Sequence, residues 1–284
     1  MSRNLHKYYY KDYFGGKSEE IFVTDNRGIR HHENRSLDWK NIKSDKNASI
    51  LKKRNTQLTR AGLLYKIDKP VDTKDTFELE IIYPGLVTGI GINHEATIEG
   101  EFKLGVHFDW THGMPVIYGS SVKGVLRTWF KEFYKGKRDP NDYEMEIFEG
   151  KLRDTEKEKE KYGTNWETKV KSLENRIYTP QSIYKRDIFF DAVITKGDSN
   201  GRILCSDSIT PHGGTPLKNP TPITFMKIAP GCQLQFRFKL NGNEDEKNSK
   251  LNLFKTILTT VGIGAKTNVG YGQLKQLNNA ADNQ

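Results

Sequence analysis

The chain has 284 residues and a net charge of +9, with 45 lysines and arginines against 36 aspartates and glutamates. This balance is typical of a protein with a polyanionic partner, although it is equally compatible with good solubility alone. The two cysteines, Cys205 and Cys232, form no Cys-x-x-Cys pair, so neither a zinc ribbon nor a disulfide framework is indicated. No apolar run approaches membrane-spanning length and no signal peptide opens the sequence, so we expect a cytoplasmic protein without a membrane partner.

Residues 1–70 hold nearly all of the excess charge. They contain 16 basic and 8 acidic residues, a net of +8 out of +9. Aromatic residues are scattered among this charge, with a cluster at Tyr8, Tyr9, Tyr10, Tyr13 and Phe14. Basic residues interleaved with aromatic ones can hold a nucleic-acid strand by charge and stacking, and they can also pack on a neighbouring subunit. We expect a basic N-terminal extension with one helix over residues 46–65, and a core that folds without this extension.

The next segment predicts a strand, a loop and a helix. Alternation over residues 77–83 predicts a strand that ends at Pro84 and Gly85. A loop follows over residues 86–100, and residues 101–107 predict a short strand or the return of a hairpin. After an apolar triplet at 116–118, Ser120 or Ser121 can cap a helix. The apolar residues of this helix recur at helical spacing: Val122, Val125, Leu126, Trp129 and Phe130.

Two hydroxyl groups and two cations gather at the start of this predicted helix. Lys123 and Arg127 are four residues apart, close behind Ser120 and Ser121. Together with the backbone amides of a helix N-terminus, these groups could hold a phosphate. The alternative is an ordinary capped amphipathic helix with a solvated basic face.

The second half of the chain predicts an insertion, four strands and a helix. Residues 135–176 are highly charged and predict a solvated insertion into the domain. The predicted strands span residues 187–194, 202–205, 224–229 and 232–240, with a loop over 207–222 and an amphipathic helix over 248–261.

A glycine-rich segment follows this helix. Residues 262–274 read Gly-Ile-Gly-Ala-Lys-Thr-Asn-Val-Gly-Tyr-Gly-Gln-Leu, and glycines let backbone amides approach a ligand closely. The segment is not a P-loop, because Ala265 precedes Lys266 where that motif requires glycine. Taken alone, a glycine-rich turn between a helix and a strand is weak evidence for a binding site.

Two motifs resemble those of the RAMP superfamily, the repeat-associated RNA-binding proteins of CRISPR systems. The run Pro-Val-Ile-Tyr-Gly-Ser-Ser-Val-Lys-Gly-Val-Leu-Arg at 115–127 is similar to the turn that opens their first helix. Residues 262–274 are similar to their glycine-rich loop before the last strand. The runs Phe-Phe-Asp-Ala and Asp-Ser-Ile-Thr-Pro-His further resemble the subunit-six family of type III-B Cmr complexes. The resemblance implies an α+β, ferredoxin-like (RRM-like) domain over residues 71–284, with a charged insertion at about 135–180.

The same resemblance implies a function. The chain would be a subunit of a type III-B CRISPR (Cmr) RNA-guided effector complex in antiviral defence, holding guide RNA (crRNA) near its 3′ end by phosphate contacts and shape. Its partners would be crRNA, with target RNA as a second candidate, and the repeating backbone subunit, the small subunit and the first Cmr subunit. The residues implied in RNA contact are Ser120, Ser121, Lys123, Arg127, Gly264, Lys266, Thr267, Asn268 and Tyr271.

The resemblance implies no cleavage site. RAMP backbone subunits that cut target RNA carry an aspartate in the loop after the first strand, and residues 86–100 contain none. We therefore expect no enzymatic activity, no metal and no cofactor. One alternative is a RAMP-type endoribonuclease that uses histidine for acid–base cleavage, with His94, His107, His112 and His212 as candidates. The other alternative is a repeating backbone subunit with an unusual first loop.

Overall fold

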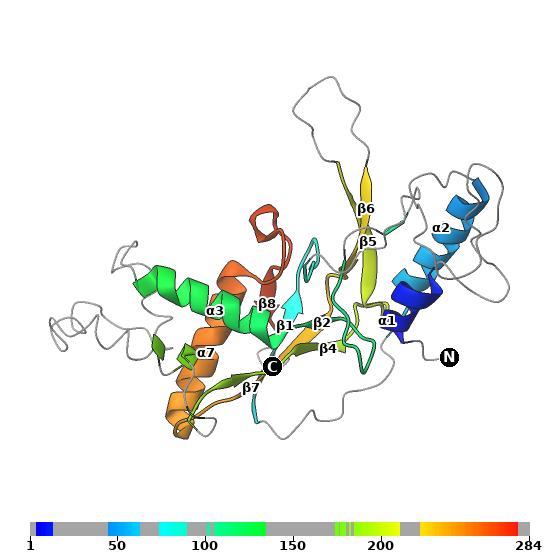
Figure 1. Ribbon diagram of the computed structural model, residues 1–284. Coiled ribbons are helices and arrows are strands. Elements are labelled where there is room, and N and C mark those ends of the chain that lie inside the picture. Colours follow the sequence, from blue (N-terminus) through cyan, green and yellow to red (C-terminus); the bar gives the residue numbers. More distant parts are fainter. Residues whose placement is uncertain are drawn as a thin grey trace, which may run out of the picture.

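The computed structural model describes residues 4–13, 45–62, 74–89, 101–102, 105–134, 174–175, 177–179, 182, 185–210 and 222–277. At its centre is an antiparallel sheet with the strand order β2-β4-β7-β1-β8, and the short strand β3 also pairs with β7. Helices α3 and α7 lie together on one face of this sheet (Figure 1). The elements are β1 (Asp75–Ile81), β2 (Val116–Ile117), α3 (Gly119–Tyr134), β3 (Ile188–Phe189), β4 (Ala192–Lys196), β7 (Gln233–Lys239), α7 (Glu244–Val261) and β8 (Leu274–Gln276). The protein is therefore a mixed α/β protein built on an antiparallel sheet.

Alternating apolar residues hold the helices on the sheet. Phe77 of β1 is paired with Phe236 of β7, and their rings stack with centroids 5.4 Å apart. Phe254 of α7 packs on Phe238 at 5.1 Å. Burying each such ring contributes about 1.5–3 kcal/mol by removing apolar surface from water. The predicted strand at 232–240 is confirmed and the one at 77–83 is confirmed in its larger part, although β1 ends at Ile81; the period-two pattern matches the buried face of β1 and β7.

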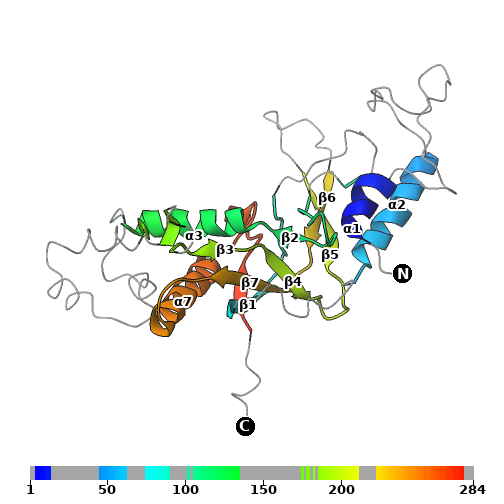
Figure 2. The ribbon, with the colours of Figure 1, turned by 60° about the horizontal axis from the view of Figure 1, so that its bottom comes forward.

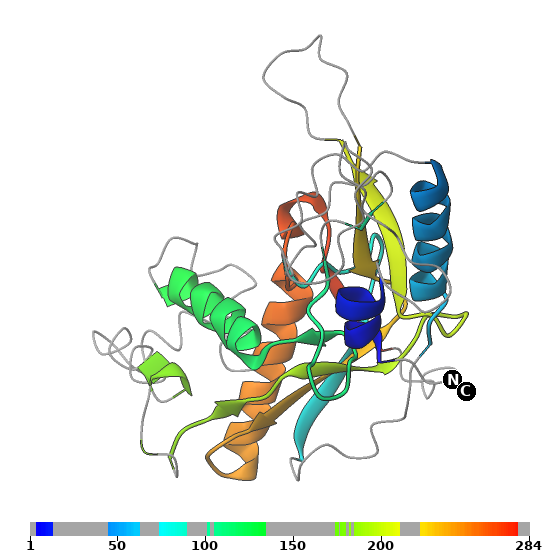
Figure 3. The same ribbon diagram turned by 45° about the vertical axis from the view of Figure 1, so that its right-hand side comes forward.

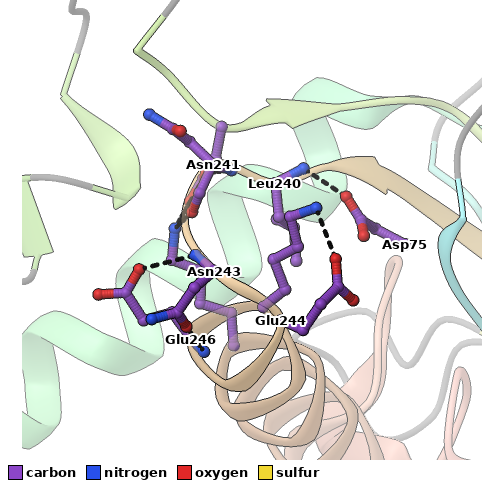
Figure 4. Close-up of polar contacts among 9 residues, drawn as sticks. Asp75, Leu240, Asn241, Asn243, Glu244 and Glu246 are labelled. Carbon is purple, nitrogen blue, oxygen red and sulfur yellow. Dashed lines mark hydrogen bonds and ion pairs between the residues drawn. The ribbon is translucent and has the colours of Figure 1, made fainter.

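Helix α7 begins earlier than its apolar pattern predicts. Asn243 and Glu246 form a capping box, in which the Glu246 amide donates to Asn243 Oδ1 at 2.9 Å and the Asn243 amide donates to Glu246 Oε2 at 3.1 Å (Figure 4). The helix therefore begins at Glu244 rather than at residue 248, because these reciprocal bonds satisfy two of its first amides. Just before the helix, the Leu240 amide donates to Asp75 Oδ2 at 2.7 Å and fixes the end of β7 against β1.

A second, two-stranded sheet stands beside the main one. It consists of β5 (Leu204–Ile209) and β6 (Ile223–Ile228), paired antiparallel. The sequence predicted a strand only over residues 202–205, but β5 continues through Asp207 to Ile209. This is a correction to the predicted loop at 207–222. The alternating, partly exposed residues of β5 have too few apolar positions to reveal a strand without its partner β6.

The N-terminal segments pack against the small sheet. They comprise α1 (Leu5–Lys7), a π-helical turn (Tyr8–Asp12) and α2 (Asp45–Thr59), and α2 contacts β5. Figures 2 and 3 show α1 and α2 side by side along β5 and β6. The helix predicted over residues 46–65 is confirmed in its larger part and ends at Thr59.

The N-terminal tyrosines are not all exposed. Tyr9 and Tyr13 are completely buried, together with Leu5, Leu51 and Leu58, in the same core cluster as the residues of the main sheet. The Tyr9 hydroxyl donates to the Phe102 carbonyl at 2.9 Å. The expectation that the core folds without residues 1–45 stays a prediction, and the burial of Leu5, Tyr9 and Tyr13 in the shared core argues against it. Phe14 lies outside the described residues.

Two further strand predictions need correction. The strand expected at 187–194 is split into β3 and β4, and Phe190 and Asp191 lie between the two strands. The Arg237 guanidinium donates to the Asp191 carbonyl at 2.9 and 3.1 Å, so this carbonyl bonds to a side chain instead of a neighbouring strand. At 101–107, the residues that the structure describes form no strand, and Gly105 makes only an isolated bridge with Gly89. The predicted insertion lies outside the described residues between 135 and 173. Within the described part of the chain, none of the helices is both long enough and apolar enough to cross a membrane.

Candidate nucleic-acid interface

The glycine-rich loop, residues 262–273, is fastened to the turn that follows β1. The Gly272 amide donates to the Gly85 carbonyl at 2.8 Å, and the Ala265 amide donates to the Val87 carbonyl at 2.8 Å. Gly264 and Gly272 have φ angles of 99° and 72°, and a Cβ atom on either one would collide with a backbone carbonyl oxygen. Only glycine can occupy these two positions, so the two glycines are required for this loop conformation.

The apex of this loop presents free backbone donors. Lys266 is left-handed, with φ 62°, and a short 3-10 turn (Thr267–Val269) follows it. The amides of Val269 and Tyr271 donate to the Lys266 carbonyl at 3.1 and 3.3 Å, which closes the turn. In contrast, the amides of Lys266, Thr267 and Asn268 donate to no residue that the structure describes. Consecutive free amides at a left-handed residue form a concave set of donors suited to an anion.

The start of α3 is organised differently from the expectation. The helix begins at Gly119, whose amide donates to Asp191 Oδ1 at 2.7 Å. The amides of Ser121 and Val122 donate to the Tyr118 carbonyl at 2.8 and 3.0 Å. Ser120 and Ser121 therefore lie inside the first turn and do not cap the helix, which is a correction. The Asp191 carboxylate stabilises the positive end of the helix and places a negative charge where a phosphate would otherwise bind.

The two cations of α3 have partners within the protein. Lys123 Nζ lies 5.8 Å from the centroid of the Phe189 ring, and Arg127 Nε lies 3.6 Å from Glu174 Oε1. Glu174 is buried, so its charge is held against Arg127. RNA contact through Ser120, Ser121, Lys123 and Arg127 stays a prediction. The intramolecular partners of Lys123 and Arg127 would compete with a phosphate for these two cations.

A partly buried ionic cluster lies against the glycine-rich loop. Lys227 of β6 is only 6% exposed and forms an ion pair with Asp207 of β5, and its ammonium lies 5.3 Å from the centroid of the Tyr271 ring. The Tyr271 hydroxyl donates to Asp207 Oδ2 at 2.8 Å. Because Tyr271 is only 9% exposed, its side chain positions the loop, and RNA contact through Tyr271 stays a prediction.

The pKa values of this cluster follow from its burial and hydrogen bonds. Burial raises the pKa of Tyr271 to about 12, and the hydrogen bond to Asp207 acts in the same direction. Burial also acts to raise the pKa of Asp207, but the hydrogen bonds from Lys227 and Tyr271 outweigh it and hold the pKa below its ordinary value. Asp207 is therefore an anion and Tyr271 a neutral donor at physiological pH.

The structure thus separates the predicted site residues into two groups. Lys266, Thr267 and Asn268 share the apex of the glycine-rich loop, and Gly264 and Tyr271 belong to the same loop on either side of the apex. The residues of α3 form the other group, and no hydrogen bond or ion pair between described residues joins the two. Sequence reasoning missed Asp191, Asp207 and Lys227. The motifs contained the two aspartates, but nothing in the sequence indicated their partners.

Two of the four candidate histidines, His107 and His112, lie within the described residues. The His107 ring stacks on Tyr118 at 4.9 Å, and the His107 amide donates to Thr88 Oγ1 at 2.6 Å. The His112 amide donates to Asp109 Oδ1 at 2.5 Å in a tight turn. The described residues contain no group of three side chains that could hold a metal ion. His94 and His212 lie outside the described residues.

Comparison with known proteins agrees with the two sequence motifs. A model of the RAMP superfamily matches residues 78–275, and the chain belongs to that superfamily. Within it, the chain is similar to the CRISPR system Cmr subunit Cmr6 of Pyrococcus furiosus, with 25% identity over 222 residues. This match covers 65% of the chain and 64% of the relative, so the chain spans somewhat less than two thirds of the relative's length.

Two solved structures are also similar to this one. A cryo-EM structure of the type III-B Cmr-β complex bound to cognate target RNA includes a chain with a TM-score of 0.47 and 18% identity, over 82% of this chain and 75% of that chain. The crystal structure of Cmr6 from Pyrococcus furiosus gives a TM-score of 0.40 and 21% identity, over 71% of this chain and 96% of that chain.

Proposed function

We propose that this protein is a non-catalytic guide-RNA-binding subunit of a type III-B CRISPR (Cmr) effector complex, placed near the 3′ end of the crRNA. Membership of the RAMP superfamily and the similarity to a Cmr subunit support this proposal. The observation that carries it is the apex of the glycine-rich loop, where the amides of Lys266, Thr267 and Asn268 donate to no residue that the structure describes.

These donors recognise a phosphate rather than a base. Backbone amides and a lysine bind the charge and the oxygens that every nucleotide shares, so they fix position without reading sequence. This property suits a subunit whose guide changes with each spacer. Gly264 allows the loop to lie close to the Val87 carbonyl, and so holds the free amides in place.

The fold that we propose is a ferredoxin-like RAMP domain over residues 71–284, with an insertion at about 135–180 and a basic extension over 1–70. The order β1-α3-β4-β7-α7-β8 supports it, because this is a split β-α-β-β-α-β arrangement in which β1 and β7 are central. We further propose the repeating backbone subunit, the small subunit and the first Cmr subunit as protein partners. The similarity to a Cmr subunit supports this choice.

The salt dependence of RNA binding tests the phosphate contact. The purified full-length protein is titrated with single-stranded RNA at several salt concentrations, and Lys266→Ala is compared with Lys275→Ala. Lys275 serves as a matched control because it is paired with Glu80 at the sheet edge. Lys266→Ala should weaken binding and reduce the salt slope by about 0.7, the contribution of one phosphate contact on a single strand. An unchanged slope would show that Lys266 does not touch phosphate.

A broader substitution tests the α3 cations at the same time. If Lys123 and Arg127 also contact RNA, the triple Ala variant of Lys123, Arg127 and Lys266 will flatten the salt dependence further than Lys266→Ala alone. Equal slopes for the two variants would assign the phosphate contact to the loop and leave the α3 cations as structural residues.

The absence of catalysis is tested directly. Purified protein should leave a labelled guide or target RNA intact, with and without Mg²⁺. Cleavage that disappears in His94→Ala or His112→Ala would instead support the endoribonuclease alternative.

A further inference from the structure

Three exposed apolar side chains gather on two neighbouring turns. Among the described residues, the large apolar side chains that remain exposed are Tyr83 (84%), Trp110 (70%), Val269 (63%) and Ile82 (36%). Ile82 and Tyr83 belong to the turn at 82–85 that follows β1, and Val269 belongs to the glycine-rich loop. Exposed aromatic residues on a rigid surface commonly mark a binding site.

Hydrogen bonds hold these two turns together. The Gly85 amide donates to the Ile82 carbonyl at 2.9 Å and closes the first turn. Two further bonds join this turn to the glycine-rich loop. The Ile82 amide donates to the Gln273 carbonyl at 3.1 Å, and the Gly272 amide donates to the Gly85 carbonyl at 2.8 Å. A Cβ atom on Gly270 would lie 3.8 Å from Pro84 Cδ, so the second turn packs directly on the first. The backbone that carries the exposed Tyr83 ring is therefore fixed against the loop that carries the free amides.

We propose that Tyr83 is a stacking platform for a base of single-stranded RNA whose phosphate is held by Lys266 and the amides of Thr267 and Asn268. The inference rests on the proposed function and adds to it a second kind of contact at the same loop. A single strand offers bases that are free to stack, and an aromatic ring accepts any of the four because each has a π face. Stacking on Tyr83 therefore adds affinity without sequence preference.

The chemistry of the patch favours RNA over a protein surface. A protein that covered Tyr83 and Val269 would also bury the free amides at 266–268 and would have to supply an acceptor for each, because a buried unpaired amide is costly. A nucleotide brings both parts in one unit, since its base is flat and apolar on its faces while its phosphate accepts hydrogen bonds. The apolar patch is also small, with one ring and two aliphatic side chains.

The test compares RNA with and without bases. The full-length protein is titrated with a fluorescent oligouridine of about 12 nucleotides and with a matched abasic oligonucleotide of the same length and charge. Tyr83→Ala should bind oligouridine about tenfold more weakly than wild type, the order expected for one base stacked on an aromatic ring. Its affinity for the abasic strand and its salt slope should remain those of wild type. Tyr83→Phe keeps the ring and should bind both strands normally.

Two variants make the result decisive. Trp110→Ala removes another exposed ring, on the 109–113 turn beside His6, and should leave RNA binding unchanged. Lys266→Ala should weaken binding of both strands, because each carries phosphates. The inference is overturned if Tyr83→Ala binds oligouridine like wild type, if it weakens both strands equally, or if it impairs only assembly with protein subunits. If the wild type shows no salt-dependent binding of either strand, the proposed function fails together with this inference.

Discussion

The Tyr271 hydroxyl donates a hydrogen bond to Asp207 Oδ2 across 64 residues of sequence, at 2.8 Å. Asp207 lies on β5 and Tyr271 at the end of the glycine-rich loop, so this bond fastens the loop to the two-stranded sheet. Lys227 completes the contact, because it pairs with the same carboxylate oxygen and lies over the Tyr271 ring. The conformation of the loop therefore depends on a partly buried polar cluster as well as on its glycines.

Removing the hydroxyl should loosen the loop. Tyr271→Phe keeps the ring that packs on Phe225 but deletes the bond to Asp207. We expect a loss of about 1 kcal/mol in the free energy of unfolding, the usual net value of one hydrogen bond. RNA affinity should fall while its salt slope stays at the wild-type value, because no phosphate contact is removed. Urea unfolding and salt titration measure these two effects, and a reduced slope would mean that the hydroxyl itself contacts phosphate.

Removing the carboxylate should cost more. Asp207→Ala leaves the buried Lys227 ammonium without its counter-charge, and we expect a loss of about 2 kcal/mol or more in the free energy of unfolding. A second change, Lys227→Met, should recover most of that loss, because no unpaired charge then remains buried. Urea unfolding of both variants checks this, and a double variant less stable than Asp207→Ala would argue against the pairing.

The same carboxylate should make stability depend on acid pH. Hydrogen bonds from Lys227 and Tyr271 hold the pKa of Asp207 below its ordinary value despite burial, so the unfolded chain binds more protons than the folded one as the pH falls below about 4. Stability is therefore lost as the pH falls through the folded-state pKa. Asp207→Asn should flatten this part of the curve in urea unfolding between about pH 3 and 6.

A second carboxylate provides a comparison for the pH effect. Burial acts to raise the pKa of Asp198, but the side-chain hydrogen bond from Arg202 and two backbone amides lower it overall. Asp198→Asn should therefore flatten the acid limb independently of Asp207→Asn, and the two effects should add because the groups have separate hydrogen-bond partners. An acid limb that is identical in Asp207→Asn and wild type would contradict the role of Asp207.

The start of α3 should depend on Asp191 rather than on its serines. Asp191→Ala removes the acceptor of the Gly119 amide and the negative charge near the helix N-terminus. We expect a loss of about 1 kcal/mol, as for other side chains that cap a helix. Ser120→Ala is the matched control, because Ser120 is exposed in the first turn and should cost little. Thermal unfolding compares the two variants. If Ser120→Ala were the less stable one, Ser120 rather than Asp191 would be the capping residue.

The sequence predicts the parts of this fold that have a local signal. Period-two alternation identified β1 and β7, and apolar residues at helical spacing identified α3 and most of α7. The two motifs at 115–127 and 262–274 identified the superfamily that the comparison then confirmed. The glycines of the loop predicted an unusual backbone conformation, because glycine adopts positive φ angles readily. The structure has positive φ angles at Gly262, Gly264, Gly270 and Gly272.

The rest depends on contacts between distant residues. The sequence shows an aspartate within a predicted strand at 187–194, but not that Asp191 reaches Gly119 across 72 residues and breaks that strand. Likewise, the sequence does not show that Lys227 lies beside Asp207, because this contact arises only when β6 pairs with β5. The exposure of Tyr83 follows from the turn that holds it, whereas its apolar strand neighbours predict burial.

The N-terminal segment gives the last prediction. Its charge and tyrosines suggested an arm for RNA or another subunit, yet Tyr9 is buried against the domain itself. The Tyr9 hydroxyl bonds to the Phe102 carbonyl, and the ring lies 5.6 Å from that of Tyr13. Tyr9→Ala should therefore destabilise the protein by about 3 kcal/mol, because it leaves a cavity in the core and an unpaired carbonyl. Tyr9→Phe should lose only about 1 kcal/mol, the value of the hydrogen bond.

Deletion of residues 1–13 extends this prediction to the whole segment. The truncated protein should unfold at a lower temperature than wild type, because Leu5, Tyr9 and Tyr13 leave apolar surface on the remaining core exposed to water. Tyr83→Ala is the appropriate control, since it removes a tyrosine that is already exposed and should unfold like wild type. A truncated protein that unfolds normally but assembles poorly would instead mean that this segment acts in docking alone, and that its packing on the core contributes nothing to stability.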